Sequence, residues 1–196
     1  MIRRFEAFEP ILEAGAWVDE TALVVGDVTL GADSSVWPMS VVRGDVNFIR
    51  IGARTNIQDG SVLHVTHDNE AAPGGHPLVI GDEVTVGHRV TLHACRIGNR
   101  CLIGMGAIVL DGAVVPDETL IGAGSLVPPR RELEGGYLWL GNPVRRVRAL
   151  TADEKGYLRY SAEHYGFRGR HPASDRDAAQ GFGSSANPRR TPSGSD

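Results

Sequence analysis

A repeat of six residues runs through most of this chain. Aliphatic or aromatic residues recur at every sixth position through several blocks of the sequence, and a small or β-branched residue usually stands four positions after each of them. The recurring positions are Val18, Val24, Leu30, Val36, Val42 and Phe48, then Ile51, Ile57 and Leu63, then Ile80, Val86 and Leu92, and finally, one residue early, Ile97, Ile103, Val109, Val115, Ile121 and Val127. A period of six fits neither the period of about 3.6 of an amphipathic helix nor the alternation of a long strand.

The repeat predicts an all-β solenoid, a parallel β-helix in which short strands joined by tight corners stack coil upon coil around one apolar core. Three hexads make one triangular coil, and the pattern resembles that of the left-handed parallel β-helices. The 25 glycines among 196 residues suit such a turn-rich architecture. A β-sandwich is the alternative, but its strands recur every 8 to 12 residues or so with alternating polar and apolar positions, a longer spacing than the six residues seen here.

Two interruptions of the period are informative. The period gains three residues between Phe48 and Ile51, and between Leu63 and Ile80 it gives way to a polar loop over residues 65–79. Loops held on a rigid scaffold often carry function, so this loop is a candidate functional segment.

A change of composition after Val127 divides the chain into three parts. We expect residues 1–130 to form the β-helix, residues 131–166 a connecting segment and a C-terminal α-helix, and residues 167–196 a disordered tail rich in Gly, Ser, Pro and Arg. Thr151 and Glu154 have the spacing of a capping box, which predicts where the helix begins, and Gly166 is expected to end it.

Charge and hydropathy exclude several classes of function. The formal net charge of −4 leaves no broad basic field for nucleic acid. No uncharged apolar run approaches the roughly 18 residues that would cross a membrane, and no signal-peptide pattern is present, so we expect a cytoplasmic protein. Cys95 and Cys101 are too few for a disulfide framework or a zinc ribbon, and Cys101 has the inward position of its hexad, which predicts burial.

Three of the seven histidines fall within hexads. If each interrupted hexad counts as one edge of the triangle, His64 and His93 stack with Arg43 in one column on successive coils. Stacked residues lie about 4.8 Å apart, so two such imidazoles can both reach a metal ion at about 2.0 to 2.1 Å. We expect the histidines outside the hexads to be solvated surface residues: His67, His76, His164 and His171.

His88 lies one edge earlier, five residues before His93, and an extended chain separates the two by up to roughly 16 Å. One subunit could hardly bring all three histidines to one ion, whereas a threefold oligomer could. Three neutral nitrogen ligands with one open position are typical of catalytic zinc. The sequence therefore predicts a metal site at the subunit interfaces of a trimer.

Polar and charged residues crowd the same part of the repeat. Arg43, Asp45 and Asp59, with Asn56 and Gln58, occupy corners of the predicted coil. A surface ion pair there would contribute less than about 1 kcal/mol. Their place in the histidine column favours a second interpretation, in which they join subunits and orient the metal ligands.

These motifs resemble those of the gamma-class carbonic anhydrases and their bacterial hexapeptide-repeat relatives. The resemblance spans about residues 10–165 and rests on Arg43-Gly44-Asp45, Asn56-Ile57-Gln58-Asp59-Gly60, Leu63-His64, Gly87-His88, Leu92-His93 and Ile103-Gly104-Met105-Gly106. It implies a homotrimer of left-handed β-helices with three metal sites, each holding His64 and His93 of one chain and His88 of the next.

The resemblance also implies roles around the metal. Gln58 would hydrogen-bond the metal-bound hydroxide, with Asn56 beside it, and Tyr160 would reach the pocket from the helix. Arg43, Asp45 and Asp59 would make ion pairs between subunits. Zn²⁺, or Fe²⁺ or Co²⁺ in its place, lowers the pKa of bound water from 15.7 to about 7, and the hydroxide attacks CO2 to give bicarbonate.

The chain departs from active family members in its acidic residues. Those enzymes resemble one another in having a glutamate after the Asp45 position and another in an acidic loop. This chain has Val46 instead of the first, and its loop offers His67, Asp68, Glu70 and His76 at a different spacing. A histidine with a pKa near 6.5 can relay protons.

Two other functions fit the same fold. Hexapeptide β-helices include acyltransferases that use a CoA-linked acyl donor and one histidine base without a metal, and fold alone does not separate the two. A catalytically silent trimeric scaffold would bind metal without turnover. Metal content separates the acyltransferase from the others, and turnover separates the enzyme from the scaffold.

Overall fold

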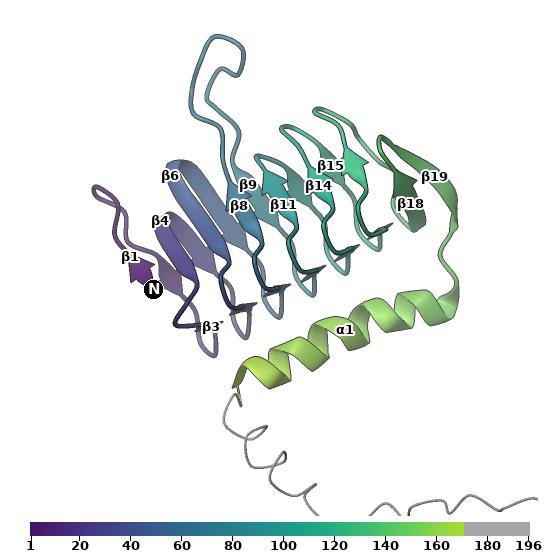
Figure 1. Ribbon diagram of the computed structural model, residues 1–196, viewed down its shortest axis with the longest axis horizontal. Helices are drawn as coiled ribbons and strands as arrows, with labels where there is room; N and C mark the ends of the chain where they lie inside the picture. Colours follow the sequence, from purple (N-terminus) through teal and green to yellow (C-terminus); the bar gives the residue numbers. More distant parts are fainter. Residues whose placement is uncertain (171–196) are drawn as a thin grey trace, which may run out of the picture.

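Short parallel strands stack coil upon coil into a left-handed β-helix of about eight turns, with one helix beside it (Figure 1). This computed structural model describes residues 1–170, with side chains as far as Tyr165. The solenoid predicted from the six-residue repeat is therefore confirmed. Within the described residues no helix combines the length and apolar character needed to span a membrane. The boundaries between the three predicted parts remain a prediction, and residues 171–196 of the expected tail lie outside the described residues.

Two hydrogen-bonded sheets make the three faces of the coil. The larger, of 11 strands, turns a corner through its long strands and covers two faces; it contains β1 (Ile2–Arg3), β2 (Ile11–Leu12), β4 (Leu23–Leu30), β6 (Val41–Ile51), β8 (Val62–His64), β9 (Leu78–Ile80), β11 (Thr91–His93), β12 (Arg96–Ile97), β14 (Ile108–Val109), β15 (Val114–Val115) and β17 (Leu126–Val127). The smaller, of eight strands, contains β3 (Trp17–Val18), β5 (Ser35–Val36), β7 (Asn56–Ile57), β10 (Thr85–Val86), β13 (Leu102–Ile103), β16 (Leu120–Ile121), β18 (Tyr137–Gly141) and β19 (Val144–Ala149).

The core consists of the inward positions of the repeat, stacked in rows along the coil axis. Leu92 is the register partner of Leu63 on one side and of Val109 on the other, and Leu63 pairs in turn with Val42. The small residues four positions after the repeating ones, from Ala22 to Ser125, are buried beside these rows. Burying one Val, Leu or Ile side chain of these rows stabilises the folded state by about 1.5 to 3 kcal/mol. The rows therefore hold the coils in register.

One predicted inward position is wrong. Phe48 is 36% exposed, and the guanidinium of Arg50 lies 4.7 Å from the centre of its ring, whereas the neighbouring Ile49 is fully buried. The repeating position that the six-residue period assigned to Phe48 is instead held by Ile51, the register partner of Leu30, and Ile49 lies two residues before it, opposite Val28.

The pairing of β4 with β6 gives the reason. Gly26 pairs with Gly44, but Val28 pairs with Ile49, so one residue on β4 lies opposite the four residues 45–48 on β6. The three extra residues thus enter before Ile49 and form an outward bulge, here called the β6 bulge (residues 45–48). A bulge re-aims the side chains that it carries without breaking the ladder on either side.

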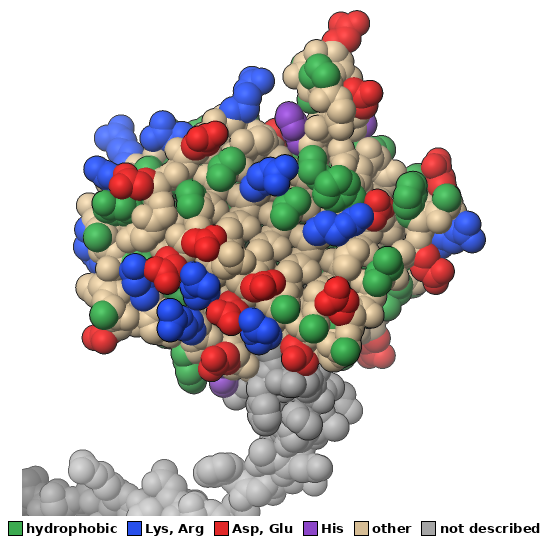
Figure 2. Space-filling view, turned by 180° about the vertical axis from the view of Figure 1, so that it is seen from behind, with side chains coloured by type: hydrophobic (Ala, Val, Ile, Leu, Met, Phe, Trp, Pro, Cys, Tyr) green, Lys and Arg blue, Asp and Glu red, His purple; other side chains and the backbone are tan. Residues whose placement is uncertain are grey.

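A second excursion leaves the coil between β8 and β9. The projecting loop (residues 65–77) stands well away from the body of the solenoid (Figure 1) and carries acidic side chains toward its tip (Figure 2). It folds back on itself through isolated bridges between Thr66 and His76 and between Asn69 and Ala72. The polar loop predicted from the broken period is therefore an ordered, hairpin-like projection.

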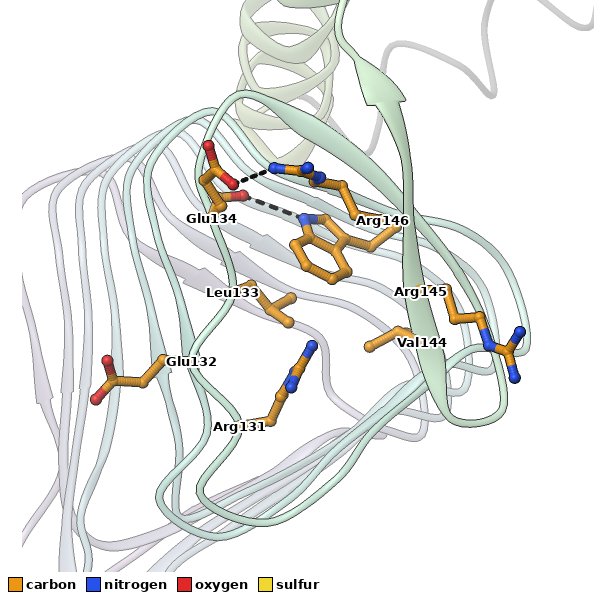
Figure 3. A pocket seen from close by; sticks show the side chains of 8 residues that line it. Arg131, Glu132, Leu133, Glu134, Val144, Arg145 and Arg146 are labelled. Carbon is orange, nitrogen blue, oxygen red and sulfur yellow. Dashed lines mark hydrogen bonds and ion pairs between the residues drawn. The ribbon is translucent and has the colours of Figure 1, made fainter.

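The antiparallel hairpin of β18 and β19 closes the C-terminal end of the coil. The indole of Trp139 covers the core there and donates a hydrogen bond of 3.1 Å to the carbonyl oxygen of Glu134, whose side chain pairs with Arg146 (Figure 3). An open cavity of about 590 Å³ lies beside this cap, and none of the predicted site residues lines it.

Helix α1 (Ala152–Arg170) runs back along the smaller sheet and contacts β5, β7 and β10 (Figure 1). The predicted capping box is present, because the Glu154 amide donates to Thr151 Oγ1 at 3.2 Å and the Thr151 amide donates to Glu154 Oε2 at 2.9 Å. The predicted end at Gly166 is wrong, since the helix continues to Arg170. A glycine within a helix costs only about 1 kcal/mol and does not by itself end it.

We expect the stacked rows to dominate stability. Replacing the fully buried Ile121 of β16 with alanine should lower the free energy of unfolding by about 2 to 5 kcal/mol, because a cavity opens in the row. Ile108→Ala, on the 38% exposed position of β14, is the matched control. Chemical denaturation of both variants measures the difference, and equal losses would contradict the stacked-core account.

The start of α1 should be sensitive to acid. The Arg148 guanidinium and the amide of Thr151 lower the pKa of Glu154 from its ordinary 4.5 to about 2. Stability from this carboxylate is therefore present above pH 4.5 and is lost as the pH falls toward 2. Between these values, Glu154→Gln should show a smaller acid-induced loss of stability than the parent, measured by thermal melts at each pH. Identical pH profiles would contradict this.

Candidate metal centre

His64 and His93 lie side by side on adjacent coils, as predicted from their positions in the repeat. They are register partners at the ends of β8 and β11, and Nδ1 of His64 lies 3.1 Å from Nε2 of His93. The two histidines pair because the residues before them, Leu63 and Leu92, are register partners whose side chains pack in one row of the core. The core thus fixes where the two imidazoles stand.

A carboxylate holds the outer nitrogen of each ring. His64 Nε2 donates to Asp45 Oδ1 at 2.9 Å, and His93 Nδ1 donates to Asp111 Oδ1 at 2.7 Å. Burial alone raises the pKa of Asp45, but hydrogen bonds from His64 and Arg43 outweigh it, and the pKa is lowered. Likewise burial raises the pKa of Asp111, whereas hydrogen bonds from Thr66 and His93 lower it overall. Both groups are therefore carboxylates, and they accept hydrogen bonds only.

The protonation of the pair follows from these contacts. If the outer nitrogens carry the hydrogens that bind the carboxylates, the inner nitrogens of the two neutral rings present lone pairs to each other at 3.1 Å. Burial lowers the pKa of His64, which favours its neutral form. Two facing lone pairs need a cation between them, either a proton or a metal ion. Two nitrogens bound to one tetrahedral zinc ion lie about 3.3 Å apart, close to the distance here.

The β6 bulge supplies Asp45. Arg43, on the strand just before the bulge, pairs with the second oxygen of Asp45. The bulge turns Asp45 toward the outer nitrogen of His64, and Arg43 holds the carboxylate in that place. The ion pair predicted from the sequence therefore exists within one chain, and its predicted role between subunits remains a prediction.

His88 follows β10 at a different corner of the coil. Its Nδ1 bonds Asp59 Oδ2 at 2.9 Å, and its side chain is 40% exposed, against 19% for His64. A cavity of about 430 Å³ adjoins it, lined also by Met39 and Arg89. Within the described residues of one chain, no group of three His, Cys, Asp or Glu side chains is placed to hold a metal ion.

Asn56 and Gln58 belong to a buried hydrogen-bonded chain under α1. Gln58 Nε2 donates to Asn56 Oδ1 at 3.2 Å, Asn56 Nδ2 donates to Thr85 Oγ1 at 3.1 Å, and Thr85 Oγ1 lies 2.9 Å from Ser161 Oγ of the helix. Gln58 also lines a mostly apolar cavity of about 300 Å³ between the helix and the smaller sheet. The chain of bonds fixes the Gln58 amide with its Oε1 oxygen left as an acceptor.

Tyr160 lies on the outer side of α1. It is 58% exposed and stacks on His164, with ring centroids 5.6 Å apart. The helix residues that line the cavity beside Gln58 are Tyr157, Ser161 and Tyr165. The predicted role of Tyr160 remains a prediction.

Three residues of this site were not predicted. Asp111 holds His93, Thr66 of the projecting loop donates to Asp111, and Asn47 of the β6 bulge holds the loop. A signal for Asp111 was present, because it lies 18 residues after His93, one residue more than the coil that pairs Leu92 with Val109. Thr66 and Asn47 lie where the period is broken, and the repeat carries no information about them.

Both cysteines are excluded from this chemistry. Cys95 and Cys101 are unpaired and buried, which confirms the prediction for Cys101. Burial raises the pKa of both thiols, and that of Cys101 to about 12. Neither is a thiolate at neutral pH.

We therefore expect neither thiol to react with Ellman's reagent in the native protein at pH 8. Two equivalents should react once the chain is unfolded in guanidinium chloride, and the reagent's absorbance at 412 nm or so reports both states. Rapid reaction of either thiol in the native protein would contradict their burial.

Comparison with known proteins gives the class. No protein-family model matches the chain. It is 54% identical over 165 residues to Protein YrdA of Escherichia coli, covering 84% of this chain and 90% of that protein. It is 40% identical over 172 residues to a carbonic anhydrase of Geobacillus kaustophilus, covering 79% of this chain and 81% of the relative.

The chain is also similar to a plant protein and to a solved bacterial structure. Gamma carbonic anhydrase 1 of Arabidopsis thaliana mitochondria is 44% identical over 156 residues, covering 80% of this chain and 56% of the plant protein. The crystal structure of a hexapeptide transferase family protein from Anaplasma phagocytophilum is 37% identical with a TM-score of 0.79, covering 87% of this chain and 96% of that one.

The fold and the paired histidines define a hexapeptide-repeat β-helix of the carbonic anhydrase class, a class that implies a metal cofactor. The chain belongs to the gamma carbonic anhydrase family.

Proposed function

We propose that this protein hydrates CO2 reversibly to bicarbonate at metal sites shared between the subunits of a homotrimer. The metal is Zn²⁺, or Fe²⁺ or Co²⁺ in its place, and each site takes His64 and His93 from one chain and His88 from the next. One observation carries the proposal. Two imidazoles, each held from outside by a carboxylate, face each other with ring nitrogens 3.1 Å apart.

His88 supports the sharing of the site. It repeats the same arrangement at another corner, since Asp59 holds one ring nitrogen and the other, Nε2, has no partner within the described residues. Carboxylate–histidine pairs of this kind fix the tautomer of metal ligands and raise their basicity. A ring assembly that repeats one heterologous contact around a threefold axis would bring this corner to the paired histidines of a neighbour.

The bound metal supplies hydroxide at neutral pH by lowering the pKa of water. The remaining steps belong to the chain. Asp45, Asp111 and Asp59 orient the three imidazoles, because each carboxylate accepts a hydrogen bond from one ring nitrogen and leaves the other nitrogen to bind the metal. Asn56 fixes the amide of Gln58, so that its Oε1 oxygen is the acceptor for a hydroxyl hydrogen, and the apolar cavity beside it suits an uncharged substrate.

A second candidate, acyl transfer from a CoA-linked donor, is favoured by the name of the Anaplasma neighbour, a transferase family protein. Acetyl transfer that survives chelation of the metal would favour it. Metal at one ion per subunit without any turnover would instead favour a trimeric scaffold. We further propose a cytoplasmic location, because two unpaired buried thiols suit a reducing compartment.

Mixing two inactive variants tests the shared site. Stopped-flow CO2 hydration should be abolished in metal-loaded His88→Ala and in His64→Ala. Subunits of the two refolded together in equal amounts should regain about a quarter of the parent activity, since one in four random interfaces joins an intact His88 to an intact pair. Parent activity in His88→Ala alone, or no recovery in the mixture, would contradict the proposal.

A matched control separates loss of the ligand from loss of the fold. His67→Ala removes an exposed histidine of the projecting loop. Among the described residues, the His67 ring is hydrogen-bonded to no carboxylate, unlike the rings of His64, His88 and His93. It should keep the metal content and the sedimentation of the parent trimer. A monomer that binds one metal ion through all three predicted ligands would exclude the interface site.

A further inference from the structure

The projecting loop is fastened at its base to the β6 bulge. The Asn47 amide nitrogen donates to the carbonyl oxygen of Thr66 at 3.2 Å and to that of Gly74 at 3.3 Å. Gly75 lies against the same contact with a φ of +67°, and a Cβ there would come within 2.3 Å of the Thr66 oxygen. Only glycine fits, so the loop base is held tightly against the bulge that also carries Asp45.

A second contact joins the loop to the metal column. Thr66 Oγ1 donates to Asp111 Oδ2, while the other oxygen of that carboxylate, Oδ1, accepts from His93 Nδ1 at 2.7 Å. Asp111 follows β14, one coil beyond His93, whereas Thr66 is 45 residues earlier in the chain. One carboxylate therefore binds the loop with one oxygen and a predicted metal ligand with the other.

The surroundings of this carboxylate leave it few other partners. Its side chain is 36% exposed, and the groups that lower its pKa are Thr66, His93 and its own backbone amide. No arginine or lysine pairs with Asp111 among the described residues, in contrast to Asp45, which Arg43 holds. Thr66 therefore holds the carboxylate of Asp111 in the way that Arg43 holds the carboxylate of Asp45 on the other side of the histidine pair.

We propose that Asp111 is a positioning residue that couples the projecting loop to His93. Thr66 fixes the carboxylate, and the carboxylate fixes the ring orientation and tautomer of His93. Displacement of the loop base frees the carboxylate to turn and so weakens metal binding at a distance from the ion. The link to metal affinity rests on the proposed function, whereas the link between Thr66 and the His93 ring does not.

The test uses the full-length protein and four variants. Thr66→Val removes the hydroxyl at constant shape, Thr66→Ser restores it, and Asp111→Asn removes the charge. Asp117→Asn is the matched control, because Asp117 also follows a short strand of the coil, β15, and its partners among the described residues are Asn99 and Arg100 rather than a histidine.

The first readout needs no metal. In the metal-free protein at pH 8, nitrogen NMR of the imidazoles should show His93 with its hydrogen on Nδ1 in the parent, in Thr66→Ser and in Asp117→Asn. Asp111→Asn should move it toward the Nε2–H form, and Thr66→Val should move it part of the way while amide exchange at Thr66 and His76 rises tenfold or more. An unchanged His93 signal in Thr66→Val would overturn the coupling.

The second readout is the affinity for Co²⁺, followed by its visible absorption. Asp111→Asn should weaken binding by about 10- to 100-fold, the usual cost of losing such a partner. Thr66→Val should lose a smaller factor, and Thr66→Ser and Asp117→Asn should bind as the parent does. If the parent binds no Co²⁺, the proposed function fails while the NMR result still decides the coupling. If the tautomer shifts and affinity does not, the coupling to metal binding is overturned.

Discussion

The register between neighbouring coils determines the positions of both the core residues and the paired histidines. Each short strand is too small to be stable alone, and it gains its hydrogen bonds and its apolar contacts from the coils above and below. Because Leu63 pairs with Leu92, the residues that follow them, His64 and His93, must also be neighbours. A shift of either strand by one position would turn the histidine that it carries into the core. The apolar rows thus do more than stabilise, since they set the distance between two imidazoles.

Electrostatics then selects what such a pair can do. Two adjacent histidines on a surface with no other partners would orient freely. Here Asp45 and Asp111 hold the rings from opposite sides, and each carboxylate is held in turn, by Arg43 or by Thr66. The result is an arrangement in which the inner nitrogens have no acceptable partner except a cation. Preorganised ligands of this kind lose little conformational freedom when an ion binds.

The sequence predicts regular parts of this structure well and irregular parts poorly. A period of six located most of the core residues of the coil and paired His64 with His93 across 29 positions, because inward positions are counted reliably as long as coils are regular. The period placed Phe48 in the core, although extra residues enter the strand there. A hydrophobic residue at a repeating position gives the same sequence pattern whether its side chain points into the core or toward solvent. The period could not find Thr66 or Asn47, which hold the site from outside the repeat. The prediction that the helix ends at Gly166 is wrong for another reason, since packing of α1 against the sheet outweighs the weak helix propensity of one residue.

The offsets between contacting residues have a consequence for how the chain tolerates change. His93 and Asp111 are 18 residues apart, close to one plain coil, whereas His64 and His93 are 29 apart because the projecting loop lies between them. The entropy of closing a loop grows only with the logarithm of its length, so this longer excursion costs about 0.4 kcal/mol more than a plain coil. Loops of other lengths at this corner are therefore compatible with nearly the same stability. One residue inserted within β8 or β11 would instead break the histidine register, so tolerance to insertion differs sharply between positions only a few residues apart.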